Sequence, residues 1–212
     1  MDEKCLGNIL KSFSEKRILV IGDVMLDRFL WGNVSRISPE APVPVVEIER
    51  EELYPGGAAN VARNLHPFAR SVAVMGLTGS DREGEQLMEI LSERGLNTDC
   101  IQSSGCNVTT VKTRVVARHQ QVVRIDHEQR ASLTKEQEDR AIEQIVQRLP
   151  ELDAVIIQDY GKGFITQSFM DRVNEIADPE QTVITVDPNP NNPVTWRGAV
   201  SYTHLTLPTN RE

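Results

Sequence analysis

Carboxylates and one lysine follow directly after three apolar runs of this chain, and these side chains can bind hydroxyl groups and phosphates. They are Asp23 and Asp27 after the first run, Asp159 and Lys162 after the second, and Asp187 at the end of the third. Carboxylates accept hydrogen bonds from sugar hydroxyls, and a lysine on a loop between glycines can meet a phosphate. The residue types therefore favour a site for a phosphorylated polyol.

Each of these residues also has a structural interpretation. Asp23 or Asp159 can cap a following helix or turn, Lys162 can be a solvated surface charge, and Asp187 can belong to an Asp-Pro turn. What favours binding is that all of them follow strand-like runs, because the carboxyl ends of parallel strands meet at one sheet edge, where ligands bind.

A glycine pair, Gly56 and Gly57, precedes a helix-like segment that contains Asn60. Glycines let backbone N–H groups approach a ligand closely, and a helix start presents unsatisfied N–H groups and the positive end of its dipole. The Asn60 amide can both donate to and accept from hydroxyls. The alternative is a tight turn followed by an ordinary helix.

Short apolar runs alternate with helix-like segments along most of the chain, which predicts a mostly parallel sheet flanked by helices. The strands are expected at about residues 18–22, 71–76, 154–157 and 182–186, and the helices at about 83–94, from 134 to 149, and at 167–177. A short run at 43–48, with prolines at its start, predicts an edge strand.

Residues 107–126 follow a different pattern, with two alternating runs joined by a short polar connection. This predicts an antiparallel hairpin. We expect the hairpin to lie off the main sheet as a flap or a dimer contact. Two extra strands at the edge of the main sheet are the alternative.

Composition excludes several classes of protein. The 212 residues carry a net charge of −8, which argues against a nucleic-acid partner. No apolar run approaches the roughly 18 residues of a membrane span, and the N-terminus lacks a signal-peptide pattern. Three cysteines without C-x-x-C spacing favour a cytoplasmic location, and four histidines show no metal-ligand spacing. P-loop, G-x-G-x-x-G and G-x-S-x-G motifs are absent.

Several motifs together resemble the ribokinase-like (PfkB) carbohydrate kinases, over roughly residues 15–200. They lie at residues 21–28, 35–45, 55–62, 76–81, 118–126 and 159–163. The run SRISPEAPVP, which begins at Ser35, is most similar to the heptose 7-phosphate kinase branch, the N-terminal domain of a bifunctional ADP-heptose synthesis enzyme. The glycine motif marks only the superfamily.

The resemblance implies transfer of the γ-phosphoryl group of ATP, with Mg²⁺, to the anomeric hydroxyl of D-glycero-D-manno-heptose 7-phosphate, for lipopolysaccharide core synthesis. It implies that the sugar is held by Asp27, Gly56, Gly57 and Asn60. It also implies that the strands at 43–48 and 107–126 form a β lid, with Arg114, Gln120 and Gln121 facing the ligand, which often forms the contact of a homodimer. Lys162 would face a phosphate, and Asp187 would lie near the nucleotide phosphates and Mg²⁺.

The chain departs from the family pattern toward its C-terminus. The family's catalytic base, an aspartate in a Gly-Ala-Gly-Asp type motif, is expected beyond residue 212, and so are the adenine and phosphate loops. We therefore expect residues 1–200 to be the N-terminal part of the kinase domain, residues 201–212 to be a non-native tail, and the 212-residue polypeptide to be inactive alone.

Two other functions stay open from the sequence. One is a ribokinase-like kinase for another sugar or a nucleoside. The other is a non-catalytic module that binds a sugar phosphate.

Overall fold

A six-stranded parallel sheet forms the body of the protein. The computed structural model describes residues 3–118, 120–177, 181–196 and 201–202. The strand order is β10-β9-β8-β1-β4-β5, and every neighbouring pair is parallel. The strands are β1 (Arg17–Gly22), β4 (Ser71–Gly79), β5 (Asn97–Ser104), β8 (Ala154–Gln158), β9 (Val183–Asp187) and β10 (Ser201–Tyr202).

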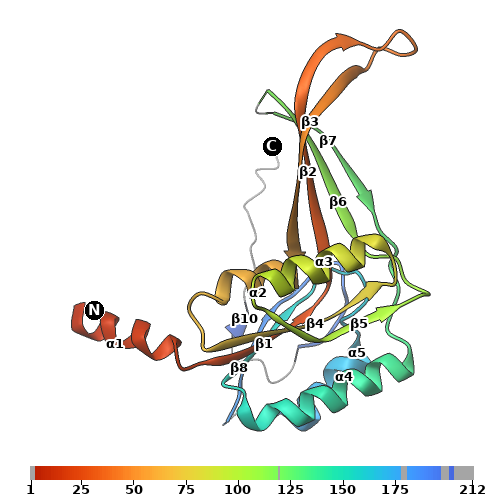
Figure 1. Cartoon of the computed structure of the whole chain (residues 1–212). Coiled ribbons are helices and arrows are strands. Elements are labelled where there is room, and N and C mark those ends of the chain that lie inside the picture. The colour runs from red at the N-terminus through yellow and green to blue at the C-terminus, as the bar shows by residue number, and fades with distance from the viewer. Residues whose placement is uncertain (1–2, 119, 178–180, 197–200, 203–212) are drawn as a thin grey trace, which may run out of the picture.

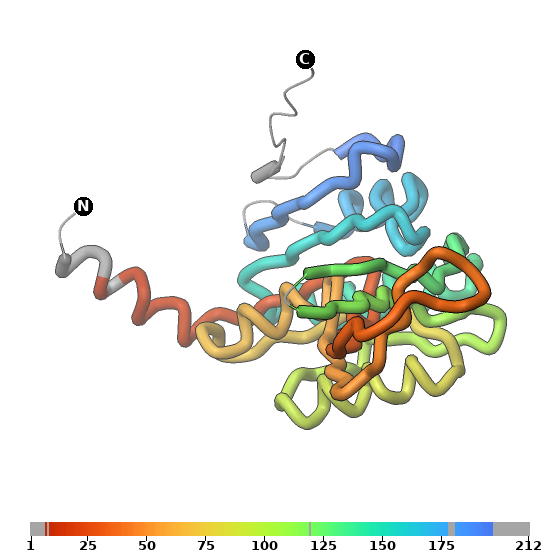
Figure 2. Tube along the Cα trace, turned by 90° about the horizontal axis from the view of Figure 1, so that it is seen from above, coloured from red at the N-terminus to blue at the C-terminus, as the bar shows by residue number. Residues whose placement is uncertain are grey.

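Helices cover both faces of this sheet, as Figures 1 and 2 show. One face carries α2 (Ala58–Leu65) and α3 (Arg82–Glu93), and the other carries α4 (Lys135–Arg148) and α5 (Gln167–Ile176). A short 3₁₀ helix, η1 (Leu149–Glu151), follows α4. The N-terminal helix α1 (Glu3–Phe13) extends away from the body in both views.

The inner strands β1, β4 and β8 are largely apolar because they bury both of their faces. On β1, Leu19 and Ile21 pack with α4 and α5, whereas Val20 between them packs with α2 and α3. The largest fully buried side chain is Phe169 of α5. This two-sided burial explains why the strands appear in the sequence as continuous apolar runs.

Local signals define the helix boundaries. The Thr134 hydroxyl accepts from the Gln137 N–H, and the Gln137 side chain accepts from the Thr134 N–H, which is the capping box expected before α4. Gly95 follows α3 with φ of 72°, a left-handed conformation that favours glycine and ends the helix.

A second sheet of four strands, which we call the lid, projects from the carboxyl edge of the main sheet (Figure 1). Its order is β3-β2-β6-β7, with β2 (Val24–Ile37), β3 (Pro44–Gly57), β6 (Val111–Ala117) and β7 (Gln120–His127). The β6–β7 pair is the expected antiparallel hairpin. Because this hairpin belongs to a separate sheet, the alternative of extra strands on the main sheet is wrong.

The lid is larger than the sequence indicated. Strand β2 was not expected, β3 continues well beyond residue 48, and the hairpin strands begin at Val111 rather than at residue 107. The pairing of β2 with β3 shifts register between Trp31 and Gly32, and again between Val34 and Arg36. These irregularities break the two-residue alternation by which a strand is recognised.

The C-terminal region is described only in part. Ser201 and Tyr202 pair in parallel with Thr185 and Val186 of β9. Residues 203–212 lie outside the described residues, so the non-native origin of 201–212 stays a prediction.

Candidate functional site

Three strand ends meet at the carboxyl edge of the main sheet, as expected. Gly22 of β1 pairs with Gln158 of β8, and Gln158 pairs with Asp187 of β9. Asp23 and Asp159 are the next residues along the first two strands. The structure therefore places the acidic residues predicted for the site at one edge of the sheet.

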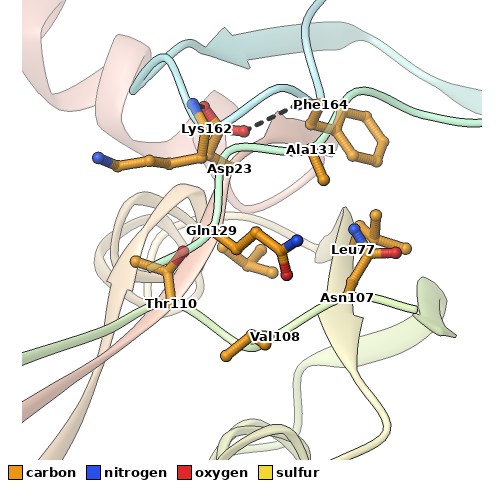
Figure 3. A pocket seen from close by; sticks show the side chains of 10 residues that line it. Asp23, Leu77, Asn107, Val108, Thr110, Gln129, Ala131, Lys162 and Phe164 are labelled. Atoms are coloured by element: carbon orange, nitrogen blue, oxygen red, sulfur yellow. Dashed lines mark hydrogen bonds between the residues drawn. The ribbon is translucent and has the colours of Figure 1, made fainter. Parts of the chain in front are cut away.

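Asp23 is a buried anchor for the loop that follows β8. Its Oδ2 accepts hydrogen bonds from the backbone N–H groups of Tyr160 and Lys162 at 2.9 and 3.0 Å. Its Oδ1 accepts from the Phe164 N–H at 3.1 Å, the bond drawn in Figure 3. Both carboxylate oxygens of Asp23 accept hydrogen bonds from the backbone, so Asp23 positions this loop. This agrees with the alternative that Asp23 has a structural role in capping a turn.

Burial raises the pKa of the Asp23 carboxyl above its ordinary value, because a desolvated charge is disfavoured. The hydrogen bonds from Lys162, Phe164 and Tyr160 oppose that shift, and the neighbouring Asp159 charge adds to it. The carboxyl is only 4% exposed, so desolvation outweighs the three hydrogen bonds.

Asp159 has a similar structural environment. Its Oδ1 accepts from the Gly161 N–H at 2.8 Å, and its Oδ2 accepts from the Asn192 side chain at 2.8 Å. Asn192 also donates to the Ile165 carbonyl. Asp159 therefore ties the loop after β8 to the segment after β9.

Asp27 and Arg114 form the charged pair at the base of the lid. The Arg114 Nη1 lies 2.5 Å from the Asp27 Oδ1, and both side chains keep some exposure to solvent. The Arg114 guanidinium also lies over the Phe29 ring, 5.2 Å from its centre. Unlike Asp23, Asp27 retains carboxylate capacity for a ligand hydroxyl.

The glycine pair lies directly behind Asp27. A Cβ on Gly56 would stand 2.7 Å from the Asp27 Oδ2, and a Cβ on Gly57 would stand 2.2 Å from the Asp23 carbonyl oxygen. Gly57 has φ of 58° and precedes α2 without a side-chain cap. The partly exposed Asn60 lies in the first turn of that helix. Asp27, Gly56 and Gly57 are therefore brought together, and Asn60 follows Gly57 by one turn of helix.

Lys162 lies apart from that group, in a chain of ion pairs. Its Nζ is 2.6 Å from the Glu128 Oε2, which also lies 3.4 Å from the Lys112 Nζ. Lys112 pairs in turn with Asp126. The ammonium group of Lys162 is therefore already paired with the carboxylate of Glu128. A phosphate that binds Lys162 would have to compete with Glu128.

A small polar pocket lies between Lys162 and the segment before the lid hairpin. Figure 3 shows Asp23, Lys162 and Phe164 on one side and Asn107, Val108 and Thr110 on the other. Its volume of about 30 Å³ suffices for water, whereas sites for small molecules span roughly 300 Å³ or more. This pocket alone is therefore too small for a sugar phosphate.

Tyr160 also lies at this edge, although no role was expected for it from the sequence. Burial raises the pKa of its phenol, and the carboxylates of Asp187, Asp27 and Asp23 raise it further. The Tyr160 residue itself is 40% exposed. An aromatic residue directly after a strand end was the signal available in the sequence.

Gln120 and Gln121 are not brought to this site. Both are exposed on β7, and Gln121 pairs with Val116, which pairs with Trp31. Trp31 is four residues from Asp27 along β2, which corresponds to about 13 Å of strand. Their contact with a ligand stays a prediction.

The described residues can be compared with the ligands that a metal ion requires. Within the described part of the chain, no three His, Cys, Asp or Glu side chains are grouped so that they could hold a metal ion. Asp187 is the last residue of β9 and pairs with Gln158 of β8. Across the same described residues, no helix has the length and apolar character needed to span a membrane.

Two solved structures illustrate the similarity of this fold to known proteins. Phosphofructokinase-2 from Escherichia coli, in a tetrameric inhibited form, superposes with a TM-score of 0.62 at 16% identity, over 82% of this chain and 55% of that one. Ribokinase from Arabidopsis thaliana, solved with ribose and ATP, superposes with a TM-score of 0.57 at 14% identity, over 82% and 53%. These likenesses show the fold, and the predicted ribokinase-like α/β class is confirmed.

Sequence comparison then gives the family. The model of the pfkB family carbohydrate kinases matches residues 15–212. The bifunctional protein HldE of Pelobacter propionicus is 40% identical over 212 residues, which are 100% of this chain and 43% of that protein. HldE of Helicobacter pylori strain Shi470 is 39% identical over 173 residues, or 82% and 37%. The chain belongs to the pfkB family of carbohydrate kinases, and it spans less than half the length of the curated relatives it matches.

Proposed function

We propose that this chain provides the sugar-binding part of a kinase that phosphorylates D-glycero-D-manno-heptose 7-phosphate at its anomeric hydroxyl, for ADP-heptose and lipopolysaccharide core synthesis. One observation carries the proposal: the Asp27–Arg114 pair lies at the base of the lid against the glycine pair. The choice of heptose rests on the branch-specific run that begins at Ser35 and on the relatives named HldE.

In this proposal the chain contributes positioning and charge. Asp27 accepts hydrogen bonds from sugar hydroxyls, and Arg114 fixes the orientation of that carboxylate. Asn60 and the start of α2 provide donors at the same place. Asp187 marks the side from which the phosphoryl donor approaches. Phosphoryl transfer depends chiefly on such positioning and on neutralising charge.

ATP is the proposed donor and supplies the γ-phosphoryl group with Mg²⁺ bound. The proposal of ATP and Mg²⁺ rests on membership of the pfkB family, and it names no ligand of the metal and no catalytic base among the described residues. A reaction that uses ATP is consistent with a cytoplasmic protein, and we place it there.

The proposal is tested by measuring sugar binding first and phosphoryl transfer from ATP second. Calorimetry on the 212-residue polypeptide should show saturable binding of heptose 7-phosphate, and weaker or no binding of fructose 6-phosphate and ribose. Transfer from ATP is assayed with the same sugars on the product of the whole gene. A preference for fructose 6-phosphate or ribose would favour another sugar kinase, and binding without any transfer would favour the non-catalytic module.

A further inference from the structure

Arg63 on α2 is a cation beside the lid that forms no ion pair with any of the described carboxylates. Its guanidinium lies over the ring of Tyr54 on β3, with the Cζ atom 5.9 Å from the ring centre. Among the described residues it donates one long hydrogen bond, of 3.4 Å, to the side-chain oxygen of its neighbour Asn64. The contact with the ring holds the guanidinium in place without cancelling its charge.

The pairing of the lid strands places Arg63 close to Asp27. Tyr54 is the direct partner of Asp27 where β3 pairs with β2. Residues paired in this way lie on the same face of a sheet, with their Cβ atoms about 5 Å apart. Asn60 and Arg63 are three residues apart on α2 and are therefore neighbours on its surface. Arg63 thus borders the part of the lid that carries Asp27.

The cations on the other side of Asp27 are already paired. Lys112 of β6 is the partner of Asp27 where β6 pairs with β2, and it shares the carboxylate of Glu128 with Lys162. Arg114, also on β6, pairs with Asp27 itself. A ligand at Asp27 therefore has neutralised cations on its β6 side and an unneutralised cation on its β3 side.

The carboxylate that follows Tyr54 on the same face of β3 is occupied by other groups. Glu52 accepts a hydrogen bond from the Trp31 indole N–H at 2.8 Å and pairs with Arg50 at 3.2 Å. An anionic ligand at Arg63 would therefore not have to displace a carboxylate of the described residues, whereas one at Lys162 would have to displace Glu128.

We propose that Arg63 binds the phosphate group of the sugar substrate. The inference rests on the proposed function and adds to it the subsite for the phosphate. A guanidinium presents a planar fork of N–H donors that matches two phosphate oxygens, and an ammonium does not. Recognition by Arg63 would therefore select a phosphorylated sugar over the same sugar without its phosphate.

The position of α2 agrees with the chemistry of the substrate. Heptose 7-phosphate carries its phosphate at the opposite end of the carbon chain from the anomeric hydroxyl, so the two groups need separate places. Helix α2 packs on β1 and β4, whereas β9, which ends at Asp187, lies beyond β8 on the other side of β1. Arg63 and Asp187 are therefore on different sides of the site.

The test compares heptose 7-phosphate with the same heptose lacking its phosphate, by calorimetry on the 212-residue polypeptide. Arg63→Met keeps an apolar contact with Tyr54 but removes the charge and the donors. Binding of heptose 7-phosphate should weaken by about 10- to 100-fold, the effect of losing hydrogen bonds to a charged group. Binding of the unphosphorylated heptose should stay unchanged, which also shows that the variant folds. Arg63→Lys, which keeps only the charge, should give an intermediate loss.

Two further variants serve as controls. Arg140→Met removes an exposed arginine of α4, on the other face of the main sheet, and should change neither affinity. Lys162→Met removes a cation already paired with Glu128 and should cost less affinity for heptose 7-phosphate than Arg63→Met does. A larger loss in Lys162→Met would overturn the inference. So would unchanged binding by Arg63→Met, or an equal loss for both sugars, which would show that Arg63 only supports Tyr54.

Failure of the proposed function is distinguishable from failure of this inference. If the wild type prefers fructose 6-phosphate, the heptose assignment is wrong, and the variants are compared with fructose 6-phosphate and fructose. A loss confined to the phosphorylated sugar then supports the phosphate subsite, and any other result rejects it. If the wild type binds only ribose, or none of these sugars, both proposals fail.

Discussion

At the scale of residues, the acidic side chains at the sheet edge divide into two groups. Asp23 and Asp159 are buried and bonded to neighbouring loops, whereas Asp27 is partly exposed and paired with one arginine. All of them follow apolar runs in the sequence, so the sequence predicted their common location. The sequence could not show which aspartates are structural and which stay available to a ligand. That difference depends on partners distant in the chain, since Asp23 binds backbone groups up to 141 positions away.

Asp27→Asn should weaken binding of heptose 7-phosphate by roughly 10- to 100-fold, because hydrogen bonds to a charged group contribute about 1.5–3 kcal/mol. The variant also leaves Arg114 without its ion-pair partner. Calorimetry measures the loss, with Asp171→Asn on α5 as the control. Unchanged affinity in Asp27→Asn would remove this carboxylate from the site.

Asp23→Asn should destabilise the fold by about 1–3 kcal/mol, because the amide nitrogen cannot accept from the loop N–H groups. The raised pKa sets the direction of the pH dependence. A carboxyl whose pKa in the folded state exceeds the unfolded value of 3.8 contributes stability below that value, and this contribution is lost as the pH rises through the raised pKa.

The difference in unfolding free energy between wild type and Asp23→Asn should therefore be largest at the acidic end of the range and should shrink as the pH rises. Urea denaturation at a series of pH values measures it. A difference that grows with pH would mean that the hydrogen bonds outweigh desolvation at this carboxyl.

At the scale of elements, the inner strands β1, β4 and β8 were predictable because both of their faces are covered, and α4 was predictable from its cap residues. Strand β5 was not expected, because its sequence NTDCIQSS is largely polar and only two of its residues are buried. Helix α1 and strand β10 were not expected either. The lid was predicted only in part. Strand β2 carries two register shifts, and it mixes buried and exposed positions without alternation. Its pairing with β6 joins segments far apart in the chain, which no local pattern reports.

An ion-pair chain joins the lid to the loop after β8, through Lys112, Glu128 and Lys162. Glu128→Gln should weaken the pairing with both Lys112 and Lys162. Backbone amide hydrogen exchange in residues 159–164 should therefore become faster. Glu40→Gln, at the tip of the lid, is the control. No change in exchange would show that Asp23 alone holds the loop.

The ion pair between Lys162 and Glu128 should make the stability of the wild type fall in acid. The hydrogen bond from Lys162 is the main cause that lowers the pKa of Glu128 below its ordinary 4.5. A lowered pKa contributes stability above 4.5 that is lost as the pH falls through the folded-state value. Glu128→Gln should lack this part of the acid dependence.

At the scale of the whole molecule, the lid exposes apolar side chains that a second copy could cover. Val123 and Ile125 on β7 are 46% and 54% exposed, and Ile48 on β3 is 47% exposed. An edge strand with apolar side chains is a surface for pairing. We propose that these residues contribute to a homodimer through the lid.

Sedimentation equilibrium should give the wild type a mass of about twice 23.8 kDa. Val123→Lys combined with Ile125→Lys should give the mass of one chain, because two charges would be buried in the contact. Val146→Lys, at a helix position that is 49% exposed, is the control. A wild type that sediments as a single chain would exclude this dimer.

The chain passes from the body into the lid before β2 and returns to the body after β3, and these two connections lie side by side. The chain enters β2 immediately after Asp23 and leaves β3 at Gly57, and the Ala58 N–H donates to the Asp23 carbonyl at 3.0 Å. The carboxylate of the same aspartate grips the loop that carries Tyr160 and Lys162. Asp23 is therefore bonded both to the base of the lid and to the loop after β8. If the lid tilted when a sugar bound, the same aspartate would shift that loop. Binding of the sugar would then change the surface available to the phosphoryl donor.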